Sequence, residues 1–511
     1  MKDVRSHYDV VLVGDSIPLA AAGALLARRG FRVAWIGRTD RPTTYVHDRH
    51  VLSRTLQSLP VVETPAFRRV IAELALGPLL RRKVLVPRPL FQAALPGHRF
   101  DVPLAGDART VEMLREFPEL QRPLEEFHAI IDTETTALDA LFGEDLAWPP
   151  EGFFERRRAA RLAGRSALVG PDAPDVLEHL PANHAFRTFV GAITRMATAT
   201  DPDRLDAVRL ARAYGAMLRG GAFYEGGRDA LHALMLEQIA RHGGEVRTRD
   251  EVVRVLLERG RVRAVELAVT DERLGCGTVL TSLRARAAYR LAGHSPSPTA
   301  SERLLSIGTR YHRFMMSVVM MRAGLPEAMG TRVFAVADRQ RSLREENLLA
   351  VEVGPADDAG HVVLTVQVLL PEAGVREGES YLARQRERVL DALRSLIPFL
   401  DEHLIATDSP HDGRPWENLR TGTQQPVQAR AAVQREPMAV IEDPAPGAYL
   451  GLCGLPAATE IPGMYLVNPQ VVPGLGEEGE WLAAVSVARA ITRSDPRREK
   501  LRRDLWTRSG V

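Results

Sequence analysis

The feature that most constrains the fold is an apolar run near the start of the chain that leads directly into a glycine and a helix-prone segment. Residues 10–13 are apolar, Gly14 follows them, an Ala- and Leu-rich segment extends to Gly30, and a second, mostly apolar run covers residues 31–36. Short apolar runs on either side of a helical segment predict a strand–turn–helix–strand unit with parallel strands. We therefore expect an α/β fold in which Gly14 marks the first strand-to-helix turn.

A unit of this kind can place the pyrophosphate of a dinucleotide on the N-terminus of its helix. The fingerprint is Gly-x-Gly-x-x-Gly with an acidic residue at the end of the second strand, and these positions hold Gly14, Ser16, Leu19 and Gly37. Ser16 puts a side chain where the backbone should approach a phosphate, and Gly37 cannot accept a hydrogen bond from a ribose hydroxyl. Asp15 adds a negative charge beside the same place. The pattern thus indicates the fold, while most cofactor-facing residues are replaced.

Length and composition narrow the class of protein. The 511 residues exceed one simple core and predict two or three domains. The 67 basic and 65 acidic residues nearly balance, so we expect no nucleic-acid partner. Two cysteines, Cys276 and Cys453, cannot make a disulfide framework and fit a reducing cytoplasm. We see no secretory signal and no apolar run long enough to span a bilayer.

Five further segments carry strand and turn signals in a fixed order along the chain. They are residues 91–107 with a hairpin turn, the Gly-rich turn 223–227, the strand pair 251–265, the apolar strand 314–325, and the strand and Pro-Gly loop 463–476. A helical pattern follows the Gly-rich turn and ends at Gly243, as expected for a C-terminal glycine. Another helical pattern follows the Pro-Gly loop.

In this order the segments resemble the phytoene desaturase and carotenoid isomerase family, within the amine-oxidase-like FAD superfamily. The resemblance is spread over most of the chain. It implies an α/β FAD/NAD(P)-binding Rossmann-like domain with an inserted mixed α+β substrate domain, and FAD as the cofactor. It implies that FAD lies against Gly14, Ser16, Gly226, Gly227, Val252, Pro473, Gly474 and Gly476. Arg38, near the expected ribose, is either a phosphate contact (for example of NADP) or a solvated strand end.

The same resemblance divides the chain into five stretches. Residues 1–65, 220–300 and 425–511 are predicted to form the three parts of the FAD-binding domain. Residues 66–219, largely helical, and residues 301–424 are predicted to form the substrate domain. In this arrangement the first and last segments of the chain cooperate at one nucleotide site.

Two functions remain open at this point. The first is an FAD-dependent oxidoreductase acting on an isoprenoid or another long apolar substrate. The second is a non-catalytic relative that has lost FAD and binds a lipid, a prenyl group or a protein partner, as the Rab GDP-dissociation inhibitors show to be possible in this superfamily. Asp15 and Gly37 favour the second, as do Glu477, Glu478 and Glu480 at the start of the last helix. The retained Gly226-Gly227 turn, Val252 and the Pro473-Gly474 loop favour the first, which is the function we predict from the sequence.

Other polar motifs are weaker. His47 and His50, three residues apart, suggest a metal site, but without a third ligand they are more typical of surface residues, and we assign no metal. His294 lies in a Gly-His-Ser-Pro turn and is interpreted as a turn residue rather than a general base. We identify no catalytic residue.

A charged segment with two aromatic residues runs from Phe153 to Arg161. Phe153 and Phe154 precede Arg156, Arg157 and Arg158, which suits either an element lying on anionic lipid at the inner face of the membrane or a solvated helix face. Four methionines in the strand around residues 315–321 fit either an apolar substrate tunnel or a core strand.

Overall fold

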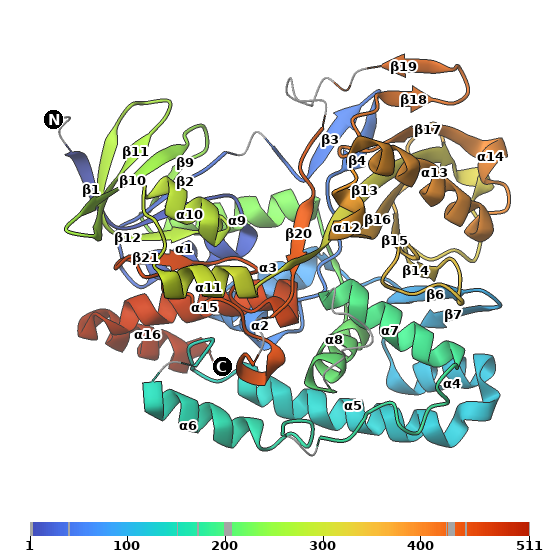
Figure 1. Ribbon diagram of the computed structural model, residues 1–511, viewed down its shortest axis with the longest axis horizontal. Helices are drawn as coiled ribbons and strands as arrows, with labels where there is room; N and C mark the ends of the chain where they lie inside the picture. Colours follow the sequence, from blue (N-terminus) through green and yellow to red (C-terminus); the bar gives the residue numbers. More distant parts are fainter. Residues whose placement is uncertain are drawn as a thin grey trace.

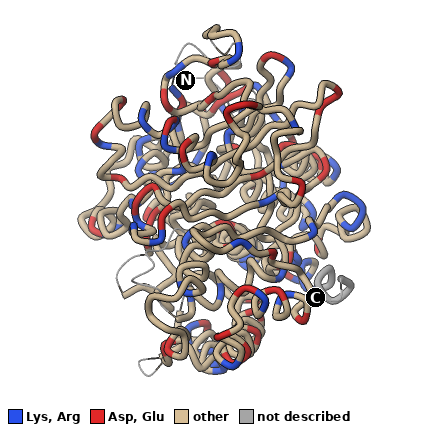
Figure 2. The backbone as a smooth tube through the Cα atoms, turned by 90° about the vertical axis from the view of Figure 1, so that its right-hand side faces the viewer, with Lys and Arg blue, Asp and Glu red and all other residues tan. Residues whose placement is uncertain are grey.

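The computed structural model describes residues 4–38, 41–150, 152–170, 173–198, 207–425, 427, 435–444 and 447–509. Two sheets dominate the described residues, and Figure 1 places them side by side above a layer of long helices. Basic and acidic residues are interspersed along the backbone in the view of Figure 2, as the near balance of charges in the sequence suggests.

The first sheet holds the predicted opening unit. Seven strands among the described residues form it: β1 (Val4–Val13), β2 (Val33–Ile36), β9 (Glu245–Arg247), β10 (Val252–Glu258), β11 (Arg261–Leu267), β12 (Arg273–Thr281) and β21 (Met464–Leu466). β21, β12, β1, β2 and β9 run parallel, in that order, and β10–β11 adds an antiparallel hairpin. The carboxyl ends of β1, β12 and β21 therefore meet at one edge, as the sequence predicts for its first and last segments.

Helix α1 (Ile17–Arg28) follows β1 because its sequence starts and stops it there. Ser16 caps the helix and accepts a hydrogen bond from the Leu19 amide at 3.3 Å, and Gly30 follows the helix with φ +82°. Gly23 lies where a Cβ would approach Leu12 and Ile239 to 2.8 and 3.0 Å. In the fingerprint, a glycine at the position of Leu19 lets the helix pack closely against the strand. Here Gly23, one turn later, allows this close packing instead.

Two more helices pack against α1. They are α9 (Gly227–Arg241) and α15 (Glu477–Arg493), the helices that follow the Gly-rich turn and the Pro-Gly loop. The short helices α10 (Ala285–Leu291) and α11 (Pro298–Ser306) follow β12, and α2 (Pro65–Glu73), α3 (Gly77–Lys83) and α16 (Pro496–Ser509) complete this part of the molecule.

The second sheet is mostly antiparallel. Ten strands among the described residues form it: β6 (Phe91–Leu95), β7 (His98–Val102), β13 (Thr309–Met321), β14 (Arg332–Val336), β15 (Leu348–Val353), β16 (His361–Pro371), β17 (Leu404–Asp408), β18 (Trp416–Asn418), β19 (Thr423–Gln425) and β20 (Ala439–Glu442). Met316 and Met320 of β13 belong to a buried core on one face of this sheet. Three helices lie beside this sheet and form one lobe with it (Figure 1): α12 (Glu372–Val375), α13 (Glu379–Leu396) and α14 (Leu400–His403).

The predicted boundaries and the sheets do not coincide everywhere. β20 pairs with β13 of the second sheet, although it lies within the predicted stretch 425–511. The hairpin β3 (Thr44–His47) and β4 (His50–Ser53), within the predicted stretch 1–65, contacts β13 and β16. A two-stranded pair, β5 (Val84–Leu85) with β8 (Phe223–Tyr224), joins the segment before β6 to the Gly-rich turn.

The helical stretch before residue 220 folds as expected. Its members are α4 (Gly106–Glu116), α5 (Gln121–Phe142), α6 (Gly152–Ala163), α7 (Ala185–Thr198) and α8 (Ala207–Arg219). α5 and α6 lie along the lower edge of the molecule, and α7 and α8 pack against each other beneath the second sheet (Figure 1).

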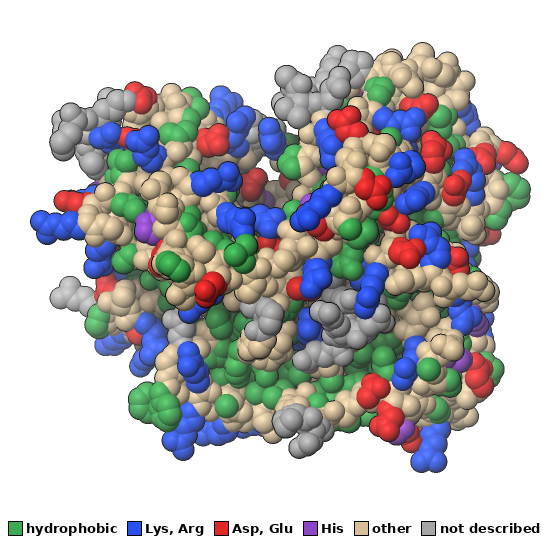
Figure 3. Space-filling model, in the orientation of Figure 1, with side chains coloured by type: hydrophobic (Ala, Val, Ile, Leu, Met, Phe, Trp, Pro, Cys, Tyr) green, Lys and Arg blue, Asp and Glu red, His purple; other side chains and the backbone are tan. Residues whose placement is uncertain are grey.

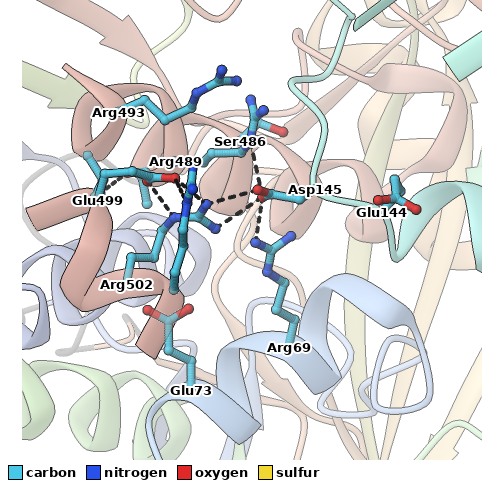
Figure 4. A network of polar contacts seen from close by, with 12 residues as sticks. Arg69, Glu73, Glu144, Asp145, Ser486, Arg489, Arg493, Glu499 and Arg502 are labelled. Carbon is cyan, nitrogen blue, oxygen red and sulfur yellow. Dashed lines mark hydrogen bonds and ion pairs between the residues drawn. The ribbon is translucent and has the colours of Figure 1, made fainter. Parts of the chain in front are cut away.

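A buried ion network ties this helical layer to the end of the chain (Figure 4). Asp145 accepts hydrogen bonds from Arg69 of α2 at 2.8 Å and from Arg502 of α16 at 2.9 Å, and Arg489 of α15 lies 3.0 Å from it. Burial alone would raise the pKa of Asp145, but these guanidinium groups outweigh it and hold the pKa at about 2. One carboxylate thus joins α2, near the start of the chain, to α15 and α16 at its end.

Candidate functional site

The turn after β1 is explained by contacts within the chain. Gly14 has φ +126°, which only glycine adopts easily, and a Cβ on it would overlap the hydroxyl of Ser282 in the segment after β12. Ser16 is committed to capping α1. Asp15 is exposed at the same helix end, so the N-terminus of α1 is open to solvent but carries its own negative charge.

The end of β2 differs from a ribose site. A Cβ on Gly37 would lie 2.5 Å from Cζ2 of Trp35 and 3.0 Å from the carbonyl oxygen of Gly14. The indole of Trp35, which is fully buried, therefore fills the space that an acidic side chain at position 37 would need. Arg38 is about half exposed and lies 3.7 Å from Glu251, which leaves its phosphate role a prediction.

The Gly-rich turn starts α9 with two residues in the left-handed region. Gly226 and Gly227 have φ +83° and +75°, which favours glycine at both positions. A Cβ on Gly227 would approach Oε1 of Gln57 to 2.7 Å, and the same oxygen accepts a hydrogen bond from the Arg228 amide at 3.1 Å. Val252, at the start of β10, is buried and pairs with Leu267 of β11.

The Pro-Gly loop after β21 is covered by other parts of the chain. Pro473 and Gly474 are buried, and a Cβ on Gly474 would lie 2.7 Å from Cα of Leu452. A Cβ on Gly476 would overlap the carbonyl oxygen of Ala197 at the end of α7. The space beside these glycines, where a backbone could approach a ligand, is thus occupied by the protein itself.

Two ion pairs close the N-terminus of α15. Arg228, the residue after the Gly-Gly turn, donates to both oxygens of Glu477 at 3.0 and 2.8 Å, and the two side chains are 15% and 19% exposed. Arg212 of α8 donates to Glu478, and both side chains are buried. The helix end that the resemblance assigns to the flavin therefore carries carboxylates that are bound to arginines.

A small cavity lies beside the Arg228–Glu477 pair, where α9 and α15 meet the second sheet. It has a volume of about 60 Å³ and is lined by Arg228, Glu477, Arg313 of β13 and Arg332 of β14. Its apolar wall includes Phe334 of β14, Met196 of α7 and Met217 of α8. Binding pockets for drug-sized ligands are about 300–1,000 Å³, so this cavity is too small for a three-ring isoalloxazine.

The residues present therefore do not fit FAD at this position. The cavity is small, a partly buried ion pair lines it, and three acidic residues stand at the start of α15. Burial and then the Glu477 carboxylate raise the pKa of Glu480, the third of these, to about 7. Arg313 and Arg228 oppose the shift.

The arginines of this cavity were not identified from the sequence. The signal was present, because a basic residue directly follows the Gly-Gly turn and an acidic residue directly follows Gly476. Each charge is unusual in a motif expected to face a cofactor, and the two neutralise each other in the structure. Arg313 and Arg332 lie in mostly buried strands that carry no motif, so no local pattern marks them.

His47 and His50 were predicted to be surface residues, and this prediction is wrong. His47 and His50 are 9% and 5% exposed, because the β3–β4 hairpin packs both rings against Trp416. His50 meets Asp357 and His361 instead, with one potential ligand atom from each residue within 4.8 Å of the others. The Arg49 guanidinium lies 3.2 Å from Nδ1 of His361, so a cation would have to displace it. His294 contacts Glu460 at 2.9 Å at the surface.

The remaining predictions concern the surface. Phe153 and Phe154 at the start of α6 are 70% and 84% exposed, and Arg156 and Arg157 beside them are exposed too. In Figure 3, apolar side chains gather at the lower left of the molecule, where Figure 1 places α6. Among the described residues, no helix is long and apolar enough to cross a membrane.

Comparison with known proteins supports the fold. No protein-family model and no curated protein matches the sequence. The structure is similar to an oxidoreductase from Methanosarcina mazei (15% identity, TM-score 0.56, 94% of this chain and 99% of the other). It is also similar to a triple mutant of putrescine oxidase (14%, 0.56, 98% and 99%) and to cyclohexylamine oxidase from Brevibacterium oxydans (13%, 0.50, 96% and 99%). The chain therefore has the predicted α/β fold with a Rossmann-like domain, and it shares this fold with the oxidoreductase and the two oxidases.

Proposed function

We propose that this chain uses the amine-oxidase-like fold without the flavin, as a binding protein whose ligand site is the cavity between the two sheets. The observation that carries this proposal is the Arg228–Glu477 ion pair. It joins the Gly-Gly turn to the start of α15, the two segments that the resemblance assigns to FAD. A buried pair of this kind is costly to break, so a flavin would have to replace it rather than fill an empty slot.

The glycines support the same proposal. In the predicted cofactor positions Gly14, Gly227, Gly474 and Gly476, the space beside the Cα is filled by atoms of Ser282, Gln57, Leu452 and Ala197. A contact within the chain therefore explains why each of these positions holds glycine, and no ligand is needed for that explanation. At the N-terminus of α15, Glu477 and Glu478 are bound by Arg228 and Arg212, so these carboxylates offset the helix dipole without a ligand.

An FAD-dependent oxidoreductase remains the second candidate. The overall fold favours it, as do the solvent-exposed N-terminus of α1 and the retained turn at Gly226 and Gly227. On that hypothesis a bound flavin would supply hydride transfer. The three arginines of the cavity do not favour the predicted isoprenoid or other long apolar substrate, because charged groups are poor neighbours for such a chain.

The two candidates differ in the colour of the purified protein. Protein expressed in cells that contain ample FAD is purified, and the flavin released on denaturation is quantified. The proposal predicts no stoichiometric flavin. The double variant Arg228→Met and Glu477→Leu, which removes the ion pair, is measured in parallel. Stoichiometric flavin in the wild-type protein would overturn the proposal and establish the second candidate's cofactor.

For the partner we propose contact with an anionic lipid surface through the start of α6. Phe153 and Phe154 are exposed together, and the neighbouring Arg156 and Arg157 provide positive charge. Aromatic side chains beside arginines suit the boundary between lipid headgroups and acyl chains. The ion pair of Glu155 with Arg489, at 2.7 Å, fixes this helix to α15.

Vesicle sedimentation tests this contact. We expect binding to vesicles rich in phosphatidylserine but not to pure phosphatidylcholine, and loss of binding after Phe153→Ser with Phe154→Ser. Phe399→Ser is the matched control, because Phe399 is 57% exposed but lies in the other lobe. Equal binding of the double variant and the wild-type protein would contradict the proposal.

A further inference from the structure

In the part of the chain that the structure describes, Arg313 and Arg332 form no close ion pair, although Glu352 lies near Arg332 and both Glu477 and Glu480 lie near Arg313. Arg332 is 4% exposed, and its Nη1 has no hydrogen-bond partner among the described residues. Arg313 is partly buried, and its Nε is also buried without a described partner. Burial lowers the pKa of both guanidinium groups from the usual value. Both side chains line the same cavity.

The acidic groups nearby are already engaged. Glu477 is bound by Arg228. Glu352 accepts hydrogen bonds from the backbone amides of Gln57 and Ser58 at 2.6 and 3.0 Å. Three guanidinium groups, those of Arg228, Arg313 and Arg332, thus face two carboxylates, those of Glu352 and Glu477. Without Glu480, the net charge of these five groups is one positive charge.

An unsatisfied buried guanidinium is unfavourable, and such groups in native proteins usually have an ion or water partner. A single negative charge in the cavity would neutralise the excess and accept hydrogen bonds from Arg313 and Arg332. A carboxylate accepts such bonds from arginine in a favourable geometry. While the Glu480 carboxyl group is neutral, the cavity therefore has the charge of a site for one monoanion.

The size of the cavity narrows the ligand further. One water requires about 10–15 Å³ of such volume, so a cavity of about 60 Å³ has room for about four to six non-hydrogen atoms. The lining of the cavity also contains Phe334, Met196 and Met217, and the guanidinium of Arg332 lies over the Phe334 ring at 5.4 Å. These apolar side chains suit the carbon end of the ligand, and methionine adapts to its shape.

We infer that this cavity binds a small organic monocarboxylate, of the size of acetate or pyruvate, with its carboxylate on Arg313 and Arg332 and its carbon end against the apolar wall. The inference rests on the proposed function, because it requires that the ligand and not a flavin occupies this position. Glu480 makes binding sensitive to pH. It faces Glu477 on its own helix, Arg313 on β13 and Arg228 on α9. Since its carboxyl group is neutral below pH about 7, the cavity is then more positive.

Calorimetric titration of the full chain with acetate, pyruvate and inorganic phosphate tests the inference. We expect saturable binding of a monocarboxylate, tighter below pH about 7 than above it, and weaker or no binding of phosphate. Arg332→Met and, as a second variant, Arg313→Gln should each weaken carboxylate binding at least about tenfold, since a charge-assisted hydrogen bond is lost. Circular dichroism and the thermal unfolding midpoint identify a variant that fails to fold.

Arg310→Met is the matched control. Arg310 lies on the same strand, three residues before Arg313, and pairs with Asp443 at 2.8 Å outside the cavity. Its replacement should leave carboxylate affinity unchanged.

The outcomes separate the two proposals. If the protein binds no monocarboxylate, or if phosphate binds as well as acetate, the inference is overturned, while absence of flavin would still support the proposed function. If the variants of Arg313 and Arg332 bind as tightly as the wild-type protein, the cavity is not the site. If FAD titrated into the same protein binds stoichiometrically, the proposed function fails.

Discussion

Removal of the Arg228–Glu477 ion pair tests the closed cofactor position through stability. Arg228 makes two hydrogen bonds to Glu477 and two more to the carbonyl oxygens of Leu56 and Ser58, at 2.7 and 2.6 Å. Arg228→Met leaves the Glu477 carboxylate with little solvent and without its hydrogen-bonded cation, although Arg313 remains nearby, and removal of one partner of a buried pair costs about 3–5 kcal/mol. Because the two side chains retain 15% and 19% exposure, we expect about 3 kcal/mol.

The reverse variant should cost less. Glu477→Leu leaves Arg228 with the Leu56 and Ser58 carbonyl oxygens as acceptors, so we expect about 2 kcal/mol. The double variant removes both charges together, and its loss should be smaller than the sum of the single losses by about 1–3 kcal/mol.

Urea unfolding followed by tryptophan fluorescence measures these differences at one common urea concentration. Trp481, one turn after Glu477 in α15, is 1% exposed and reports on this region. Additivity of the two single losses within about 0.5 kcal/mol would refute the reasoning, because it would mean that the two side chains do not interact.

Two further changes test the framework. Asp145→Asn should lower stability by about 3 kcal/mol, because Arg69, Arg489 and Arg502 each lose their ion pair with this carboxylate, while Arg489 and Arg502 keep Glu155 and Glu499; urea unfolding measures the loss, and a change below about 1 kcal/mol would contradict it. Since the pKa of Asp145 is held at about 2 in the folded chain, about 2 kcal/mol of stability present above pH about 4 should disappear as the pH falls toward 2, and this acid-dependent part should be missing in the variant. Gly14→Ala should cost at least about 1–3 kcal/mol, because alanine is strained at φ +126° and its Cβ overlaps the Ser282 hydroxyl. Ser282→Gly in the same chain should restore only part of the loss, and a thermal unfolding midpoint equal to the wild-type value in Gly14→Ala alone would show that the turn is not as described.

The sequence predicted the elements that local patterns encode. The apolar run before Gly14, the Gly-Gly turn and the Pro-Gly loop each carry a turn residue at a fixed distance from a strand or helix, and the parallel sheet brings β1, β12 and β21 to one edge. The replacements in the fingerprint also follow from the residues alone. These signals are short-range, so they can be recognised in a single sequence without an alignment of related sequences.

The contacts that define the cavity are long-range. Arg228 and Glu477 lie 249 positions apart, and nothing near either residue indicates its partner. The burial of His47 and His50 depends on Trp416 in the second sheet, so a pair that looks like a surface motif belongs to a core. β20 pairs with β13 for a similar reason, because strand pairing in an antiparallel sheet is decided by tertiary contacts rather than by its own four residues.

Calorimetric titration of FAD into the purified wild-type chain tests the central claim most directly. If the ion pair and the filled glycine positions have closed the nucleotide site, FAD should show no saturable heat, and the protein should remain colourless after removal of free FAD. Saturable binding of one FAD per chain, with the visible spectrum of a protein-bound flavin, would contradict the account.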